Sequence, residues 1–365
     1  MIRVALIGLG KMGLSHLALI RPHPLVELVA VCDPTPYITD VLGKYTGIKT
    51  YSDHKSLFAN ETLDAVVIAT PSRFHGELVR IALDRGIHVF CEKPFCLDLG
   101  EAEELAARAD ALGLINQVGY HYRFVGALRE ARRLVAANAI GRIHHIRAEA
   151  YGPVVLRPKN STWRTKKAEG GGCLYDYASH AIDTLNYIFG PPRGVSGSVL
   201  NRIFSNDVDD EVYATLHYAN GATGQLAANW SDESFRKMSL KISIWGEQGR
   251  INADRQEVQV YSRRDDAAAF GLEKGWNTRY TTDLTDEVWF YLRGEEYSAQ
   301  MDCFFRQIET GKQDNTVSFR SALETDRVIH HILRDSEGKD RPAAPSSDAP
   351  APPRGMLERV FGGRR

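Results

Sequence analysis

Three polar side chains have the types and the spacing to act together on a hydroxyl group. Lys93 stands in the run CEKP, directly after a short apolar segment. Asp176 and His180 follow the glycines at 170–172, and with Asp183 they are spaced i, i+4, i+7, on one face of a helix. An imidazole can take up a hydroxyl proton near neutral pH, and a lysine cation stabilises negative charge on the oxygen. Taken one at a time, these residues fit solvated surface positions equally well.

A glycine-rich run at residues 8–13, GLGKMG, follows the first apolar segment of the chain. In such a loop Gly8 permits a tight turn, Gly10 lets the backbone approach a pyrophosphate, and Gly13 allows close packing of helix on strand. The N-terminus of the following helix offers free amides to phosphates. Asp33 ends the second apolar segment, where a carboxylate accepts hydrogen bonds from ribose hydroxyls and repels a 2′-phosphate. The pattern therefore predicts a dinucleotide site for NAD rather than NADP.

The elements that must position these residues alternate between strands and helices through residues 1–118. Near-continuous apolar runs lie at residues 2–7, 26–32, 64–69, 87–91 and 114–118. Such runs, separated by amphipathic helices, predict a parallel sheet covered on both faces. Because the carboxyl ends of parallel strands face the cofactor crevice, we expect Lys93 to point towards it. We predict an α/β, doubly wound NAD-binding domain over residues 1–118.

From residue 119 the hydrophobic pattern changes to a period of two. Alternating runs lie at residues 146–150, 212–218, 240–244 and 258–260, with a hairpin turn at 220–221. This period predicts a large, open and mostly antiparallel sheet with one face buried. Helical stripes lie at 301–308 and 322–333, so we expect an α+β substrate and oligomerisation domain over residues 119–337. Residues 338–365 are rich in proline and predict a flexible tail.

Composition excludes several classes of function. The 365 residues are enough for about two domains. Forty-five basic against 46 acidic residues give no electrostatic footprint for nucleic acid or an anionic membrane surface. No apolar run reaches the roughly 18 residues of a membrane span, and the N-terminus lacks the pattern of a signal peptide. The five cysteines have no paired spacing, so we expect a cytoplasmic protein with reduced thiols and no metal site.

In combination, these motifs resemble the Gfo/Idh/MocA family of sugar and cyclitol oxidoreductases. The glycine loop, the acidic residue after the second strand, the CEKP run and the GGGxLxDxxxHxxD segment occur in register from residue 1 to about 335. Each motif alone is weak, but the combination is specific. The resemblance implies a Rossmann domain with bound NAD, and a reacting centre in which Lys93, Asp176 and His180 surround the nicotinamide and the substrate carbinol. It also implies a cis peptide before Pro94, and a homodimer or homotetramer formed through the open sheet face.

The predicted site residues follow from these motifs. We take His180 as the better base and Asp176 as its orienting partner or a holder of a second hydroxyl, and leave open whether Lys93 or His180 takes the proton. The cofactor-binding residues are predicted to be Gly8, Gly10, Lys11, Met12, Gly13, Asp33, Thr70, Pro71, His75, Glu92 and Lys93. The substrate-binding residues are predicted to be Tyr122, Arg123, Trp163, Arg164, Asp176 and His180. Asp209, in an acidic run before a strand, fits a solvated turn or a contact to substrate hydroxyls.

The substrate class and two alternative functions stay open. A basic stretch around Trp163, made of Arg157, Lys159, Arg164, Lys166 and Lys167, favours an anionic substrate such as a nucleotide sugar or a uronic acid. A solvated loop that balances nearby acids is the other interpretation. A redox glycosidase that retains NAD, and a non-catalytic sensor of sugar or NAD, are the alternatives to a dehydrogenase. Lys93, Asp176 and His180 together argue against a sensor, which needs no base.

Overall fold

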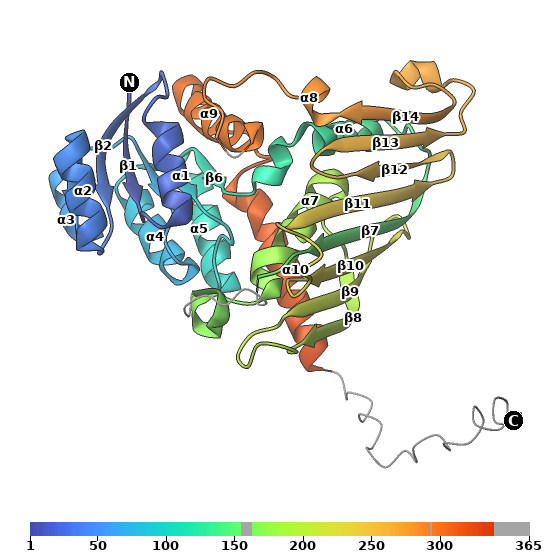
Figure 1. The fold of residues 1–365 in the computed structure, drawn as a ribbon, viewed down its shortest axis with the longest axis horizontal. Coiled ribbons are helices and arrows are strands. Elements are labelled where there is room, and N and C mark those ends of the chain that lie inside the picture. The colour runs from blue at the N-terminus through green and yellow to red at the C-terminus, as the bar shows by residue number, and fades with distance from the viewer. Residues whose placement is uncertain (155–162, 293, 339–365) are drawn as a thin grey trace, which may run out of the picture.

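The computed structural model describes residues 1–154, 163–292 and 294–338. Figure 1 shows two sheets standing side by side, a six-stranded sheet near the N-terminus and an eight-stranded sheet beyond it, with helices between them. The predicted proline-rich tail and two of the predicted basic residues, Arg157 and Lys159, lie outside the described residues. No helix within the described ranges is long and apolar enough to cross a membrane.

The first sheet is wholly parallel and has the order β3-β2-β1-β4-β5-β6. Its strands are β1 (Ile2–Ile7), β2 (Val26–Cys32), β3 (Lys49–Tyr51), β4 (Ala65–Ile68), β5 (His88–Cys91) and β6 (Asn116–Val118). The covering helices are α1 (Lys11–Ile20), α2 (Pro36–Thr46), α3 (His54–Asn60), α4 (His75–Asp84) and α5 (Leu99–Leu112). All four residues of β4 are buried, as a strand covered on both faces requires. The predicted doubly wound α/β fold is confirmed.

The second sheet has the order β14-β13-β12-β11-β7-β10-β9-β8. Its strands are β7 (Ile143–Tyr151), β8 (Gly194–Asn201), β9 (Glu211–His217), β10 (Thr223–Asn229), β11 (Ser239–Gly246), β12 (Gly249–Ala253), β13 (Glu257–Ser262) and β14 (Gly275–Tyr280). Every neighbouring pair is antiparallel except β7 and β10, which run parallel. Ile146, Ala148 and Ala150 of β7 point into the core, and the residues between them point outward. The predicted mostly antiparallel sheet is confirmed.

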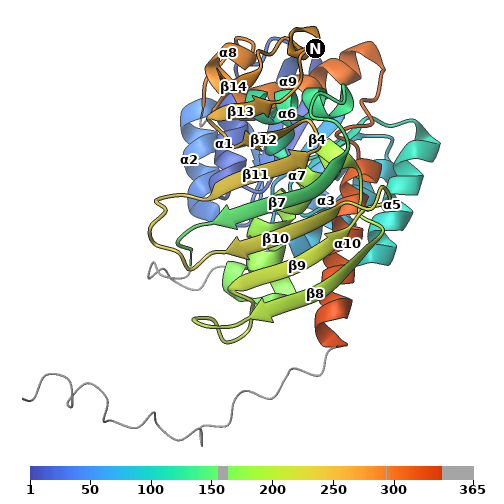
Figure 2. The same ribbon diagram turned by 90° about the vertical axis from the view of Figure 1, so that its right-hand side faces the viewer.

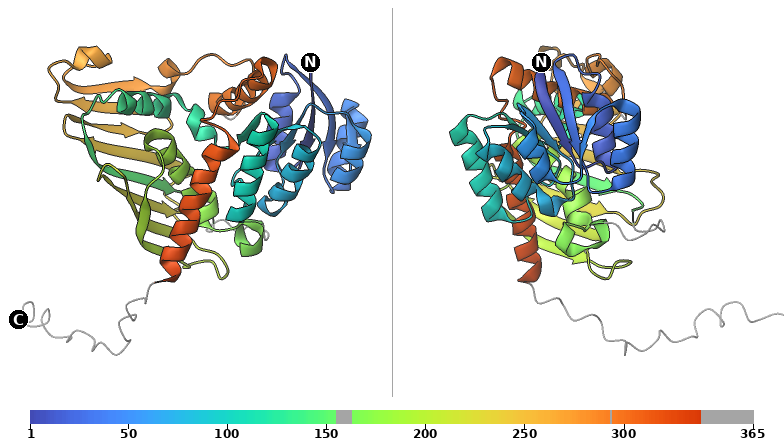
Figure 3. Two further views of the ribbon diagram at one scale, coloured as in Figure 1. Left: turned by 180° about the vertical axis from the view of Figure 1, so that it is seen from behind. Right: turned by 90° about the vertical axis from the view of Figure 1, so that its left-hand side faces the viewer.

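Helices cover only one face of this second sheet. They are α6 (Gly126–Ala136), α7 (Ser179–Phe189), α8 (Thr281–Leu284) and α10 (Phe319–Glu337), whereas α9 (Glu295–Thr310) packs against the first domain. Figure 2 looks onto the opposite face, which no described helix covers. In Figure 3, α10 lies between α5 of the first domain and the sheet of the second. Met301, Phe304 and Phe305 of α9 join the core around β1, so both C-terminal helices pack against the first domain.

Candidate active site

The glycine loop between β1 and α1 has the shape that a dinucleotide needs. Gly8 has a φ of +95°, and a Cβ there would lie 2.5 Å from the Ala69 carbonyl oxygen. A Cβ on Gly13 would lie 1.8 Å from the carbonyl oxygen of Gly8, so both positions require glycine for packing. At Gly10, by contrast, none of the described atoms lies within 4 Å of a Cβ position. Protein packing does not explain this glycine, whereas access of a pyrophosphate to the backbone does.

Asp33 closes the other side of this loop. Its Oδ2 accepts a hydrogen bond from the Leu9 N–H at 2.7 Å, and its Oδ1 accepts one from the Thr35 N–H at 2.9 Å. Lys11 and Met12 lie in the first turn of α1, which has no acidic residue to repel a phosphate. The residues present therefore fit a dinucleotide, with the Asp33 carboxylate at the end of β2.

The end of β4 lies beside the end of β1, next to the glycine loop, and β5 follows it in the sheet. His75 is fully buried, and its ring nitrogens lie 2.8 Å from the Pro94 carbonyl oxygen and 3.0 Å from that of Thr70. It thus ties the segment of Thr70 and Pro71 to the cis peptide between Lys93 and Pro94. The Thr70 hydroxyl is buried with no hydrogen-bond partner among the described residues, so it is available to a ligand. His75 therefore positions the surrounding backbone and is not exposed to a ligand.

Lys93 leaves the end of β5 and reaches the segment before α7. Its Nζ donates to Asp176 Oδ1 at 2.8 Å and to the Asp176 carbonyl oxygen at 3.1 Å. Arg164 Nε donates to the other carboxylate oxygen, Oδ2, at 2.7 Å. Burial alone would raise the pKa of Asp176, but the two cations outweigh burial and hold this pKa well below its usual range. Asp176 is therefore a fixed anion between two cations and not a proton acceptor.

His180 lies beside this ion pair among aromatic rings. It is 5% exposed, and its ring centroid lies 5.1 Å from that of His121 and 5.3 Å from that of Tyr122. Burial and then the charge of Lys93 lower the pKa of His180 well below its usual value. The imidazole is consequently neutral at neutral pH and can accept a proton. Its protonated form would be more acidic than an ordinary imidazolium and would release the proton more readily.

The segment that carries Asp176 is not a regular α-helix. Residues Leu174–Ala178 form a π-helical turn, and α7 continues from Ser179. The prediction that Asp176, His180 and Asp183 lie on one regular α-helix is therefore wrong for Asp176, which belongs to the π-helical turn. Asp183 accepts a hydrogen bond from Arg123 Nε at 2.8 Å and lies with α10 instead of at the reacting centre. The wider turn changes the angular spacing of the residues that follow it.

The predicted substrate-binding residues divide into two groups. Tyr122 lies against His180, and Trp163 packs its ring under the guanidinium of Arg164. Arg123, by contrast, is 4% exposed and donates to Asp183, to the Thr316 carbonyl oxygen and to the Ser321 hydroxyl. The structure does not bring Arg123 to the reacting centre, because its guanidinium joins α7 to the segment before α10.

Two side chains of the basic stretch near Trp163, those of Arg164 and Lys166, are paired with acidic groups. Lys166 Nζ donates to Glu169 at 3.3 Å, and the backbone N–H of Lys167 donates to Asp207 at 2.9 Å. Arg164 Nε lies on Asp176, so acidic groups hold the side chains of Arg164 and Lys166, whereas the contact of Lys167 involves only its backbone. The described residues also contain no cluster of three or more His, Cys, Asp or Glu side chains able to hold a metal ion.

Two contributors to the site have no local sequence pattern. His16, on the buried face of α1, lies with its Nε2 2.6 Å from Glu92 Oε1. Asp209 accepts a hydrogen bond from the Leu174 N–H at 2.7 Å, where the π-helical turn begins. Asp209 therefore holds the backbone of the site rather than standing in a solvated turn. Only the three-dimensional contact reveals either role.

A dinucleotide loop that leads to a lysine, a carboxylate and a neutral imidazole defines a nicotinamide-dependent oxidoreductase. Residues 2–120 match the model of an oxidoreductase family with an NAD-binding Rossmann fold, and residues 128–252 match the Gfo/Idh/MocA C-terminal domain. The chain belongs to the Gfo/Idh/MocA family. The family, the cofactor NAD and the class of oxidoreductase predicted from the motifs are thereby confirmed.

Individual relatives are similar over most of the chain. The rhizopine catabolism protein MocA of Rhizobium meliloti is 32% identical over 229 residues, which cover 62% of this chain and 70% of that protein. The scyllo-inositol 2-dehydrogenase (NAD(+)) of Bacillus subtilis (strain 168) is 27% identical over 289 residues, 76% of this chain and 82% of the relative. Among solved structures, a levoglucosan dehydrogenase in complex with NADH superposes with a TM-score of 0.81 at 26% identity, covering 92% of this chain and 97% of that one.

Proposed function

We propose that the protein transfers a hydride between NAD and a secondary carbinol of a neutral sugar or cyclitol, with Lys93, Asp176 and His180 at the reacting centre. The observation that carries this proposal is the ion pair between Lys93 Nζ and Asp176 Oδ1 at 2.8 Å, beside the buried and neutral His180. Relatives that act on an inositol and on levoglucosan support a polyhydroxylated substrate. When bound, NAD accepts the hydride from the carbinol carbon.

The roles of the polar residues follow from their charge states. His180 takes the hydroxyl proton, because its imidazole is neutral and keeps a lone pair for that proton. Lys93 stabilises the negative charge that develops on the carbinol oxygen, and Asp176 fixes the direction of the lysine ammonium. Arg164 supplies the second cation that keeps Asp176 ionised. Tyr122 and Trp163 supply the apolar and aromatic surface around the ring of the substrate.

The arrangement of the basic side chains favours a neutral substrate over a nucleotide sugar or a uronic acid. An anionic substrate would need cations free to form bidentate contacts. Arg164 and Lys166 instead lie on Asp176 and Glu169, at 2.7 and 3.3 Å. Lys167 is held beside Asp207 through its backbone. The pairing of Arg164 and Lys166 is the ground for proposing a neutral substrate; the anionic class inferred from the sequence is the alternative, and its residues Arg157 and Lys159 lie outside the described residues.

A substrate panel tests the proposal. The purified protein is incubated with NAD and with neutral free sugars, simple glycosides, inositols, uronic acids and nucleotide sugars, while NADH absorbance and product are recorded. We expect NADH to form with a neutral polyol, at a rate that Lys167→Ala and added salt leave unchanged. NADH formation with anionic sugars alone would contradict the substrate class. Cleavage of a glycoside without net NADH would instead favour the redox glycosidase.

We also propose that the uncovered sheet face mediates self-association. This face carries large exposed rings, with Trp276 at 59% and Tyr280 at 54% exposure, and Trp276 packs against Tyr261 across the strands. Exposed aromatic side chains grouped on one face are typical of protein interfaces. Light scattering should give the mass of a dimer or tetramer, which Trp276→Glu lowers. Tyr45→Glu, at a 74% exposed position on α2, is the matched control and should leave the mass unchanged.

A further inference from the structure

The imidazole of His180 lacks the hydrogen bond that usually orients a proton-accepting histidine. Such a histidine is commonly held by a bond from its second ring nitrogen to a carboxylate or a carbonyl oxygen. In His180 the Nδ1 atom is buried and has no hydrogen-bond partner among the described residues. The direction of this ring must therefore be set in another way.

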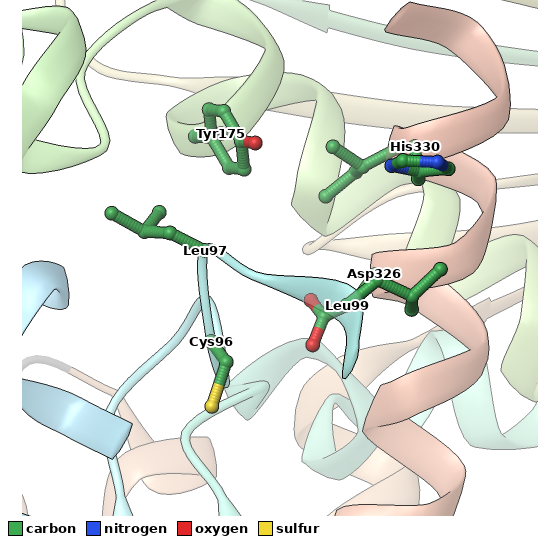
Figure 4. A pocket seen from close by; sticks show the side chains of 7 residues that line it. Cys96, Leu97, Leu99, Tyr175, Asp326 and His330 are labelled. Carbon is green, nitrogen blue, oxygen red and sulfur yellow. The ribbon is translucent and has the colours of Figure 1, made fainter. Parts of the chain in front are cut away.

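Three buried carboxyl groups lie on the elements around His180, and none of these three bonds to its Nδ1. Asp176 and Asp183 are each paired with cations. Figure 4 shows the carboxyl of Asp326 pointing from α10 to the loop before α5. The orientation of the imidazole therefore comes from the packing of its ring.

Three consecutive aromatic side chains surround the imidazole. The rings of Tyr120, His121 and Tyr122 stand edge-on to that of His180, at centroid distances of 6.1, 5.1 and 5.3 Å and interplanar angles of 88°, 72° and 71°. Edge-to-face contacts at these distances favour one ring orientation over others. His121 makes the shortest of the three contacts, so a shift of its ring would change the packing of His180 most directly.

The ring of His121 is in turn held by α9. Tyr297 of this helix stacks on it, with 4.4 Å between the centroids and 17° between the planes, and the Tyr297 hydroxyl lies 3.3 Å from His121 Nε2. One turn later lies Gln300. In the amide orientation that satisfies both of its polar atoms, its side-chain oxygen accepts from the N–H groups of Tyr120 and His121, each at 3.3 Å. Helix α9 thus holds both the backbone and the ring of this segment.

Helix α9 is anchored to the first domain, which carries the dinucleotide loop. Its apolar side chains are buried in the core around β1, and Gln117 of β6 donates to the Gln300 carbonyl oxygen at 2.9 Å. His180, by contrast, lies on α7, which packs against the sheet of the second domain. The stack of Tyr297 and His121 on His180 therefore connects a helix anchored to the first domain with a side chain of the second.

We propose that Tyr297 is a positioning residue for the reaction: by stacking on His121, it fixes the imidazole of His180 relative to the nicotinamide. This role rests on the proposed dehydrogenase function. Hydride transfer and proton removal occur at one carbinol, so the base on α7 and the cofactor on the first domain must be aligned with each other. The stack supplies this alignment across the junction of the two domains.

Two substitutions at Tyr297 and a matched control test the role. Tyr297→Leu removes the ring, whereas Tyr297→Phe keeps the ring and removes only the hydroxyl. Phe305→Leu removes a buried ring from the same helix, at a position that packs against His23 and Phe304. Steady-state kinetics with NAD and a polyol, NAD titration and urea unfolding are measured for each variant.

We expect Tyr297→Leu to lower kcat at least about tenfold, with the KM for the polyol and the NAD affinity within a few-fold of the wild type. Tyr297→Phe should keep most of the wild-type kcat, because the stacked ring is retained, and Phe305→Leu should lower stability alone. Wild-type kcat in Tyr297→Leu would overturn the proposal. So would a Tyr297→Phe or Phe305→Leu variant that is as slow as Tyr297→Leu.

A double variant tests whether Tyr297 acts through His121. His121→Leu alone should lower kcat, and adding Tyr297→Leu should cause little further loss, because no imidazole remains for Tyr297 to hold. Losses that multiply in the double variant would mean that the two residues act separately, which would overturn the proposed role of the stack.

Nuclear magnetic resonance distinguishes failure of this proposal from failure of the proposed function. In the NAD complex of protein labelled at histidine, the ring signal that His180→Ala removes belongs to His180. We expect Tyr297→Leu to shift or broaden this signal, and Tyr297→Phe and Phe305→Leu to leave it in place. If no polyol reduces NAD, the proposed function fails, but this signal still tests the stack. An unchanged signal in Tyr297→Leu would overturn the positioning role without reference to activity.

Discussion

His16 and Glu92 form a buried pair that joins α1, the helix after the glycine loop, to the strand end that carries Lys93. His16 Nε2 lies 2.6 Å from Glu92 Oε1, and the other carboxylate oxygen accepts a hydrogen bond from the Lys93 N–H at 3.2 Å. Burial alone would raise the pKa of Glu92, but the hydrogen bond from His16 and the charge of Lys93 outweigh it and lower this pKa. One carboxylate therefore connects α1 to the backbone of Lys93.

His16→Phe should weaken both stability and cofactor binding. The ring keeps most of the volume but leaves Glu92 buried without its partner, which costs about 1–3 kcal/mol of unfolding free energy. Because α1 and the Lys93 loop lose their link, we also expect weaker NAD binding. His23→Phe, which removes a buried histidine paired with Asp302, is the control and should lower stability alone. Urea unfolding and NAD titration by fluorescence separate the two effects. Unchanged NAD affinity in His16→Phe would mean that the His16–Glu92 pair contributes to packing and stability but not to cofactor binding.

Asp33 should decide the choice between the two nicotinamide dinucleotides. Its carboxylate is fixed by the N–H groups of Leu9 and Thr35, so it cannot swing away from a 2′-phosphate. We expect NAD to bind at least tenfold more tightly than NADP, about 1.4 kcal/mol. Asp33→Ser should lower the ratio of NAD affinity to NADP affinity, chiefly because it weakens the binding of NAD and leaves that of NADP unchanged. Titration of both cofactors against intrinsic fluorescence measures it, and equal affinities in the wild type would contradict the assignment.

The parallel sheet and the glycine loop were predictable because local patterns specify them. Strands buried on both faces, such as β4, are apolar at every position, and Gly8 and Gly13 are required by contacts within a single strand–turn–helix unit. The family motifs likewise predicted Lys93 and His180 as site residues, and the structure places both near Asp176. Strand β3 has only three residues, too few to show a period, and the sequence pattern did not reveal it.

Other parts of the site depend on contacts that no local pattern encodes. Asp176 lies in a π-helical turn at Leu174–Ala178, and the spacing of the polar residues did not distinguish this turn from a regular α-helix. Arg123 is paired with Asp183, which lies sixty residues later in the chain. Asp326 lies against the Cys96 loop only because α10 crosses back between the domains. Such contacts are set by packing between distant elements, which periodicity does not record.

Lys93→Met and His180→Ala should separate catalysis from cofactor binding. Lys93→Met removes the cation beside the carbinol oxygen but leaves Asp176 paired with Arg164, so the local fold should persist. His180→Ala removes the proton acceptor. We expect each change to lower kcat by roughly 10²-fold or more, with NAD affinity within a few-fold of the wild type. Steady-state kinetics and NAD titration check both. Near-normal turnover in either variant would show that the substituted residue takes no part in the reaction.

Asp209 should make the stability of the site helix depend on pH. It accepts the Leu174 N–H at 2.7 Å, and burial raises the pKa of Asp209 to about 6. An unfolded aspartate has a pKa of about 3.9, so between about pH 4 and 6 the native state holds the proton more tightly. The contribution of Asp209 to the free energy of unfolding therefore falls as pH rises through this window, and the loss persists above it.

Asp209→Asn should remove this dependence, because the amide oxygen still accepts the Leu174 N–H and carries no charge. Above about pH 6 the variant should be more stable than the wild type by at most about 3 kcal/mol, and below about pH 4 the difference should vanish. Urea unfolding across this range measures the difference. Asp207→Asn, at an exposed position nearby, is the control and should show no such trend. Parallel curves for Asp209→Asn and the wild type would mean that the buried carboxyl does not titrate in this window.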